Sequence, residues 1–155
     1  MAKRFTDTEK FKDKWYRSLT PKQKCIWEYM LATCDIAGFF EIDYENMSFH
    51  IGANVTRDDF EKFKDKVQFL TKELIFIPNF VLFQQKINSL NELNSKNKCH
   101  KGIIDVLNKH RSRGYFDFDL KISDSPKDDE EERNLRFLLG DEYDEYMANR
   151  KKKNG

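Results

Sequence analysis

The chain has 155 residues, of which 35% are charged, 39% hydrophobic and 14% aromatic, and its formal net charge is +1. This length suits one modest domain with an appendage, and the aromatic residues are numerous enough to form a compact core. No apolar run approaches the roughly 20 residues of a membrane span, and the charged N-terminus lacks the apolar stretch of a signal peptide. The composition therefore favours a cytoplasmic protein with no membrane partner.

The N-terminal part predicts a short helix followed by a longer one. Four apolar residues at helical spacing indicate that the short helix packs on the core: Phe11, Trp15, Tyr16 and Leu19. Thr20 followed by Pro21 is a helix start, and this second helix is expected to continue to about Thr33. A turn over 35–38, closed by a glycine, should end it.

A strand and two further helices are expected next. Phe40 and Ile42 alternate with acidic residues, which is typical of a short strand. Asp43 can cap a helix over 44–51. Thr56 can cap a third helix over about 57–67, with Phe60, Phe63 and Val67 facing inward.

The rest of the first 114 residues predicts a β-hairpin and a final helix. Two apolar runs, 67–70 and 74–77, joined by three polar residues, are typical of a hairpin in the place of a wing. Another apolar helical turn over 80–83 and a polar link lead to a helix over 95–109. The order of these elements predicts an α+β fold, mainly α with a small β-hairpin. We interpret it as a winged helix-turn-helix domain over 1–114, followed by a strand or linker and an acidic helical tail over 115–155.

Charge is strongly segregated in the second half of the chain. Seven cations face two carboxylates over 84–115, and twelve carboxylates face four cations over 116–147. A basic stretch followed by an acidic one suggests contact with nucleic acid plus an acidic interaction segment. Charged helix faces that merely keep the protein soluble are an equally good explanation of the pattern.

No stretch of the chain carries a catalytic or cofactor signature, so we expect a binding protein and not an enzyme. Three cysteines stand at no disulfide or metal spacing, which favours reduced thiols and no metal. His50 is interpreted as a packing residue. His100 and His110 stand among cations and are interpreted as surface residues that could touch phosphate.

An ordered set of short motifs resembles the N-terminal winged-helix domain of phage replication initiation (replisome-organiser) proteins. The first group is Phe5-Thr6-Asp7, Trp15-Tyr16, Leu19-Thr20-Pro21-Lys22, Trp27, Cys34-Asp35, Ala37-Gly38 and Asp43. The second is Ile77-Pro78-Asn79-Phe80, Phe83-Gln84, Leu93-Asn94, Asn97 and His100-Lys101. The resemblance covers residues 4–114 and implies binding of double-stranded DNA in replication initiation or its control. The family commonly continues into a C-terminal loader domain, and here an acidic segment stands in that place.

Two sets of residues are predicted to bind partners. Cations of the third helix, the wing and the last helix would contact DNA: Arg57, Lys62, Lys64, Lys72, Lys96, Lys98, Lys101, Arg111 and Arg113. Carboxylates and apolar residues of the acidic segment would contact a protein, or cover the chain's own basic region: Asp128, Asp129, Glu130, Glu131, Leu135, Leu138, Leu139, Tyr143 and Tyr146.

The alternative hypothesis is a phage-encoded inhibitor or adaptor, similar to anti-CRISPR proteins, that binds a host replication or defence complex. Two carboxylates, Asp58 and Asp59, at the start of the predicted recognition helix favour this alternative, since they repel DNA phosphates. The oligomeric state stays open.

Overall fold

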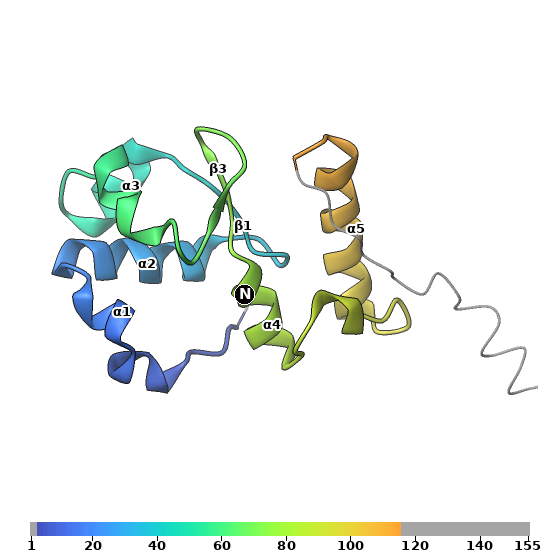
Figure 1. The fold of residues 1–155 in the computed structure, drawn as a ribbon. Coiled ribbons are helices and arrows are strands. Elements are labelled where there is room, and N and C mark those ends of the chain that lie inside the picture. Colours follow the sequence, from blue (N-terminus) through green and yellow to red (C-terminus); the bar gives the residue numbers. More distant parts are fainter. Residues whose placement is uncertain (1–2, 116–155) are drawn as a thin grey trace, which may run out of the picture. The chain divides into compact units, whose positions relative to one another are not determined.

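The long helix α2, Pro21–Thr33, begins and ends where the sequence predicts. In this computed structural model, which describes residues 3–115, Gln23 N–H donates to the Thr20 hydroxyl at 3.2 Å, and Thr20 N–H donates to the Gln23 side chain at 3.0 Å. This reciprocal capping box fixes the helix start. Ile26 and Met30 are fully buried on its inner face, and Figure 1 shows α2 running alongside α3.

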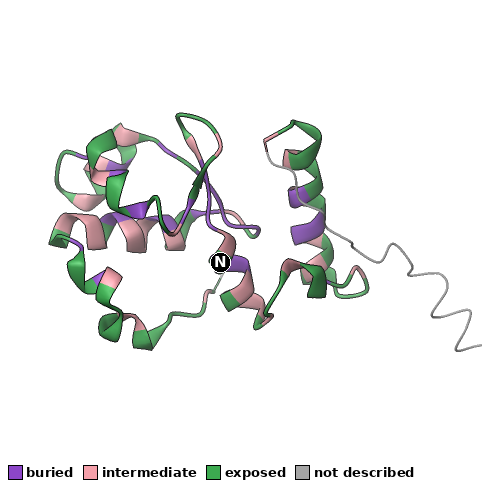
Figure 2. Ribbon diagram, viewed as in Figure 1, coloured by how far each residue is buried: buried purple, intermediate pink, exposed green. Residues whose placement is uncertain are grey.

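The single N-terminal helix predicted from the aromatic spacing is wrong, because two short elements replace it. They are the 3-10 helix η1, Thr8–Lys12, and the helix α1, Lys14–Ser18. Each has its own aspartate cap: Glu9 N–H donates to Asp7 at 2.9 Å, and Trp15 N–H donates to Asp13 at 2.7 Å. Phe11 is 65% exposed, and η1 buries none of its residues (Figure 2).

The predicted hairpin is confirmed, in a shorter form, and the predicted strand joins it in one sheet. The three strands are β1, Phe39–Glu41, β2, Gln68–Phe69, and β3, Leu74–Phe76. They are antiparallel in the order β1-β3-β2. The fold is therefore mainly helical with a small antiparallel sheet, in the α+β class.

Neighbouring residues of β1 pack on different helices. Phe40 pairs with Ile75 of β3 and its ring lies 6.2 Å from that of Tyr29 on α2. Phe39 pairs with Phe76, and its ring stacks on His110 of the last helix at a centroid distance of 3.8 Å. Because successive side chains of a strand point to opposite faces, the sheet joins two groups of helices.

The turn before β1 is held by one aspartate and requires one glycine. Asp35 accepts the N–H groups of Ala37 and Phe39, both at 2.9 Å. Gly38 has φ +83°, and a Cβ there would lie 2.7 Å from the carbonyl oxygen of Ile77. The predicted glycine turn is thus a tight approach between two backbones.

The third predicted helix is shorter and tighter than expected. Helix α3, Tyr44–Ile51, matches the prediction. The next element, η2, Arg57–Phe63, is a 3-10 helix and ends before Val67, the residue at the predicted boundary between helix and hairpin. Near the end of η2, the carbonyl of Lys62 accepts the indole N–H of Trp15 at 2.9 Å. The carbonyl of Phe63, the last residue of η2, accepts the N–H of Val67 at 3.0 Å. The expected inward residues Phe60, Phe63 and Val67 are nevertheless buried.

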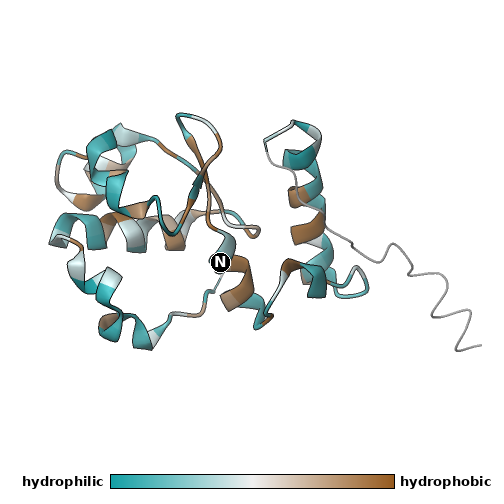
Figure 3. Ribbon diagram, viewed as in Figure 1, coloured by the Kyte–Doolittle hydropathy of each residue, from teal (hydrophilic) through white to brown (hydrophobic). Residues whose placement is uncertain are grey.

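Three helical segments follow the sheet. They are α4, Pro78–Gln85, the 3-10 turn η3, Leu90–Glu92, and α5, Lys98–Ser112. Helix α5 begins three residues later than predicted, because Asn97 caps it by accepting the N–H of Cys99 at 2.9 Å. Its apolar residues face the core, and Figure 3 shows hydrophobic and hydrophilic segments alternating along it. The predicted strand or linker and acidic helical tail lie outside the described residues, apart from Tyr115.

Candidate functional site

Two of the predicted DNA-binding cations, on separate elements, share one hollow. Arg57, at the start of η2, and Lys72, between β2 and β3, both line a cavity of about 420 Å³. Tyr44, Thr56 and Glu73 also line it. The hollow joins the end of the hairpin to the start of η2.

The η2 and hairpin region carries no excess charge. Its residues 57–73 hold five cations and five carboxylates. Lys64 is paired with Glu61. Lys62 is exposed. Lys22 of α2 lies 2.7 Å from Asp59.

Asp59 is therefore part of the framework and is not available to a ligand. Burial alone would raise the pKa of its carboxyl, but the hydrogen bond from Lys22, the N–H of Thr56 and the Lys22 charge together lower the pKa. Thr56 N–H donates to the same carboxylate at 2.9 Å. This carboxylate closes the start of η2 and joins it to α2.

Two of the predicted cations of α5, Lys98 and Lys101, lie on a separate basic surface. Residues 96–113 hold six cations and one carboxylate, Asp105. Lys98 and Lys101 are exposed, on the face opposite the buried Ile103 and Leu107. Neither lysine forms an ion pair with another residue of the described part of the chain.

The remaining predicted cations of this region lie elsewhere. Lys96 precedes α5. Arg111 is one turn after Leu107, and so lies on the other face of the helix from Lys98. Arg113 is the residue that caps the C-terminal end of α5. These three cations therefore do not form one row with Lys98 and Lys101.

The structure does not bring the two basic groups together. Helix α5 packs at the Phe39 end of β1, where His110 stacks. The hollow of Arg57 and Lys72 lies at the other end, next to Leu74, which pairs with Glu41. A ligand that contacts both groups must span the length of the sheet and its flanking turns.

The burial and contacts of the histidines differ from what the sequence predicted. His110 is half-buried, and its Nδ1 has no hydrogen-bond partner. Burial lowers its pKa, and Arg113 and Lys109 act in the same direction while Asp35 opposes them. His50 is exposed and its ring stacks on Tyr29. His100 Nδ1 accepts the N–H of Asn94 at 3.1 Å.

A second candidate site, which sequence reasoning missed, lies beneath the N-terminal segment 4–13, called the strap below. At one end, Arg4 Nη1 donates to the carbonyl of Leu31 at 3.1 Å, and Arg4 Nη2 donates to that of Cys34. Phe5 N–H donates to Gln84 Oε1 at 2.9 Å, and Gln84 Nε2 donates to the Phe5 carbonyl at 2.8 Å. The strap is thus tied to both α2 and α4.

The other end of the strap is held by a half-buried ion pair between Lys10 and Glu28. Lys10 Nζ lies 2.7 Å from both carboxylate oxygens of Glu28, and the Tyr16 hydroxyl donates to Glu28 at 2.9 Å. Burial raises the pKa of Tyr16 to about 12, and the hydrogen bond to Glu28 and its charge add to the rise. Tyr16 is therefore a permanent donor at neutral pH.

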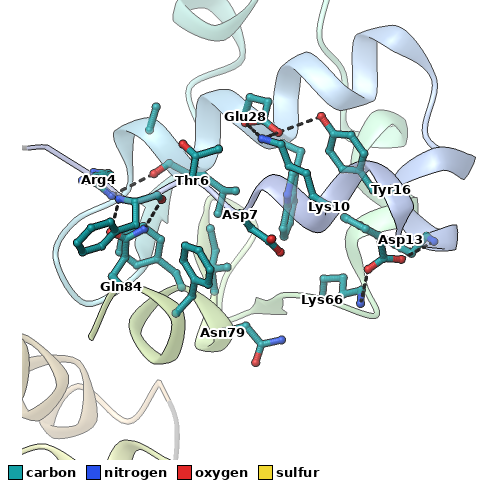
Figure 4. Close-up of a pocket in the computed structure, with 18 residues that line it drawn as sticks. Arg4, Thr6, Asp7, Lys10, Asp13, Tyr16, Glu28, Lys66, Asn79 and Gln84 are labelled. Carbon is teal, nitrogen blue, oxygen red and sulfur yellow. Dashed lines mark hydrogen bonds and ion pairs between the residues drawn. The ribbon is translucent and has the colours of Figure 1, made fainter. Parts of the chain in front are cut away.

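A pocket of about 440 Å³ lies beneath the strap, between the contacts of Arg4 and those of Lys10 (Figure 4). Four aromatic residues line it: Trp15, Trp27, Phe80 and Phe83. Asp7 of the strap lines it as well. This volume lies in the range of small-ligand sites. The aromatic residues were visible in the sequence, but only the fold shows that they surround a space.

Within residues 3–115, no group of three or more His, Cys, Asp or Glu side chains could hold a metal. In the same range no helix has the length and apolar character that crossing a membrane requires. The predicted partner-binding residues of the acidic segment, Asp128 to Tyr146, lie outside the described residues. No family model matches the chain, and comparisons with curated proteins and with solved structures found no match.

Proposed function

We propose that this chain is a winged-helix protein that binds double-stranded DNA, as the resemblance to phage replication initiation proteins implies. The observation that carries the proposal is the arrangement of elements. Helix, strand, helix, 3-10 helix and hairpin follow in the order of a winged helix, and β1 joins the hairpin in one sheet of order β1-β3-β2. Arg57 and Lys72 then stand at the recognition element and the wing, where such a domain meets DNA.

The two basic groups have different roles in this proposal. Residues 96–113 carry an excess of five positive charges. Lys98 and Lys101, which share an exposed face of α5, supply attraction to phosphates, which dominates affinity and its salt dependence. The hollow of Arg57 and Lys72 has no such excess and serves to position the duplex. The short η2 offers few side chains to a groove, so sequence discrimination should be modest.

A second candidate function is the inhibitor or adaptor role toward a host replication or defence protein. Phe49 on α3 is 81% exposed, and its ring lies 5.2 Å from that of His50, which stacks on Tyr29. An exposed aromatic of this size is typical of a protein-binding hot spot. Asp58 and Glu61, exposed on η2, also suit a basic protein better than DNA.

The proposal is tested by duplex binding measured over a salt series. Changing Lys98 and Lys101 to Glu should weaken binding and reduce the slope of log K against log salt by about two units, near one per lost phosphate contact. The matched control changes Lys14 and Arg17, which are exposed on α1, to Glu. Equal effects of both pairs would remove α5 from the site, and no duplex binding by the unaltered chain would favour the protein-partner candidate.

A further inference from the structure

The pocket beneath the strap has no part in the proposed DNA contacts, yet it has the features of a ligand site. Trp15 and Trp27 meet edge to face at 4.8 Å, and Phe63 lies behind them, 5.6 Å from Trp27. The indole N–H of Trp15 is engaged by the Lys62 carbonyl. These rings are therefore held in place before any ligand arrives.

Most charged groups around the pocket already have partners within the protein. Lys10 is bound by both oxygens of Glu28, and Arg4 is occupied by the carbonyls at the end of α2. Lys66 stands 3.9 Å from Asp13. The donors of these three cations are therefore engaged within the protein.

Asp7 is the exception. Its carboxylate accepts the N–H of Glu9 at 2.9 Å, and among residues 3–115 no cation lies within ion-pair distance of it. Figure 4 shows Asp7 between the two ends of the strap that Arg4 and Lys10 attach to the rest of the protein. A carboxylate without a counter-charge beside aromatic rings attracts a cation.

Lysines that line the pocket already place ammonium groups near its rings, and Lys10 Nζ lies 5.7 Å from the ring centroid of Tyr16. Lys66 Nζ lies 5.3 Å from the ring centroid of Trp15, which is within the range of a cation–π contact. Its amine shows that an alkylammonium can stand on this wall beside a carboxylate. The half-buried Trp27 and the exposed ring of Phe83 offer further surface for alkyl groups, whereas the ring of Phe80 is buried beneath the Arg4 guanidinium.

We propose that this pocket binds an alkylammonium cation, with the charge beside Asp7 and the alkyl groups against the aromatic walls. The ligand is either a small free quaternary amine or the ammonium of a lysine side chain, methylated or not, on another protein. The two sources share the same chemistry and differ in what else they carry. This inference does not depend on DNA binding.

Tryptophan fluorescence tests the proposal directly, because the chain has two tryptophans and both line the pocket. The full chain is titrated with tetramethylammonium chloride, with the blocked amino acid N-acetyl-trimethyllysine methylamide, and with 3,3-dimethylbutanol, an uncharged compound of similar shape. Potassium chloride at matched ionic strength is the blank. We expect a saturable change in emission with both cations, and about tenfold weaker binding of the alcohol.

Asp7→Asn is the decisive variant, because Asn also caps a helix start and the strap should keep its shape. Binding of both ammonium compounds should weaken about fivefold or more, whereas Asp58→Asn, an exposed carboxylate outside the pocket, should leave it unchanged. Tighter binding of the lysine compound indicates a protein side chain as the source, and tighter binding of tetramethylammonium indicates a free amine. No saturable change, equal binding of the alcohol, or unchanged binding by Asp7→Asn overturns the proposal.

Discussion

Replacing Gly38 by alanine should destabilise the fold more than the same change at any other glycine of the described chain. Gly38 has φ +83°, where an L-residue costs about 1–2 kcal/mol. The added Cβ would also lie 2.7 Å from the Ile77 carbonyl oxygen, a backbone atom that cannot rotate away. That oxygen accepts the N–H of Phe80 at 3.1 Å, and Ile77 N–H donates to the Gly38 carbonyl at 2.8 Å.

A shift that relieves the contact therefore weakens two backbone hydrogen bonds, each worth about 1 kcal/mol. The alanine recovers about 0.4–1 kcal/mol by restricting the unfolded chain. We expect Gly38→Ala to lower the free energy of unfolding by about 2–4 kcal/mol in a urea titration.

Gly52 provides the matched control. Its φ is +75°, but nothing lies within 4 Å of the added Cβ, so Gly52→Ala should cost only about 1 kcal/mol. The difference between the two variants isolates the contact with Ile77. If Gly38→Ala lowers the free energy of unfolding no more than Gly52→Ala does, the two backbones do not approach as closely at this turn as described.

Two further predictions concern α5. Since the folded pKa of His110 is lowered below the unfolded value of about 6.5, its contribution to stability is full above that pH and is lost as pH falls through the folded value. The urea midpoint of the unaltered protein should decrease when the pH is lowered from about 7.5 to 5.5. The decrease should be smaller in His110→Phe, which keeps a ring on Phe39, and an equal decrease in both proteins would contradict the assignment to His110. Asn97→Ala removes the cap of α5 and should lower the free energy of unfolding by about 1 kcal/mol, whereas Asn108→Ala, exposed within the same helix, should not destabilise it.

Local signals in the sequence predicted much of the fold. The Thr20 cap with Pro21, the Asp43 cap with Gly52, and the two apolar runs around Lys72 place α2, α3 and the hairpin correctly. These features succeed because the caps and turns are decided by residues three or four positions apart. The inward faces of η2 and α5 were predictable for the same reason, from the spacing of apolar residues.

Contacts between distant residues explain what the sequence could not predict. In η2, the carbonyl of Lys62 accepts a hydrogen bond from Trp15, which lies 47 positions away in the sequence. The strap depends on Phe5 and Gln84, 79 positions apart. Neither contact has a periodic signature, so the pocket that they enclose is invisible to pattern reasoning.

The division of the predicted cations is of the same kind. Nine residues shared a charge and a plausible role, and nothing in their spacing separates them. The packing of His110 on Phe39 places α5 at one end of β1, and the strand register places Lys72 at the other. Which cations act together is therefore a property of the sheet.

We propose that the chain binds duplex DNA through the basic face of α5, and a salt-dependent binding measurement tests this proposal. Affinity of the full chain for duplex DNA is measured between about 50 and 200 mM salt, for the unaltered protein, for Lys98→Glu with Lys101→Glu, and for Lys14→Glu with Arg17→Glu. We expect weaker binding, and a slope reduced by about two units, for the α5 pair alone. Binding that is unchanged in the α5 pair, or absent from the unaltered protein, would contradict it.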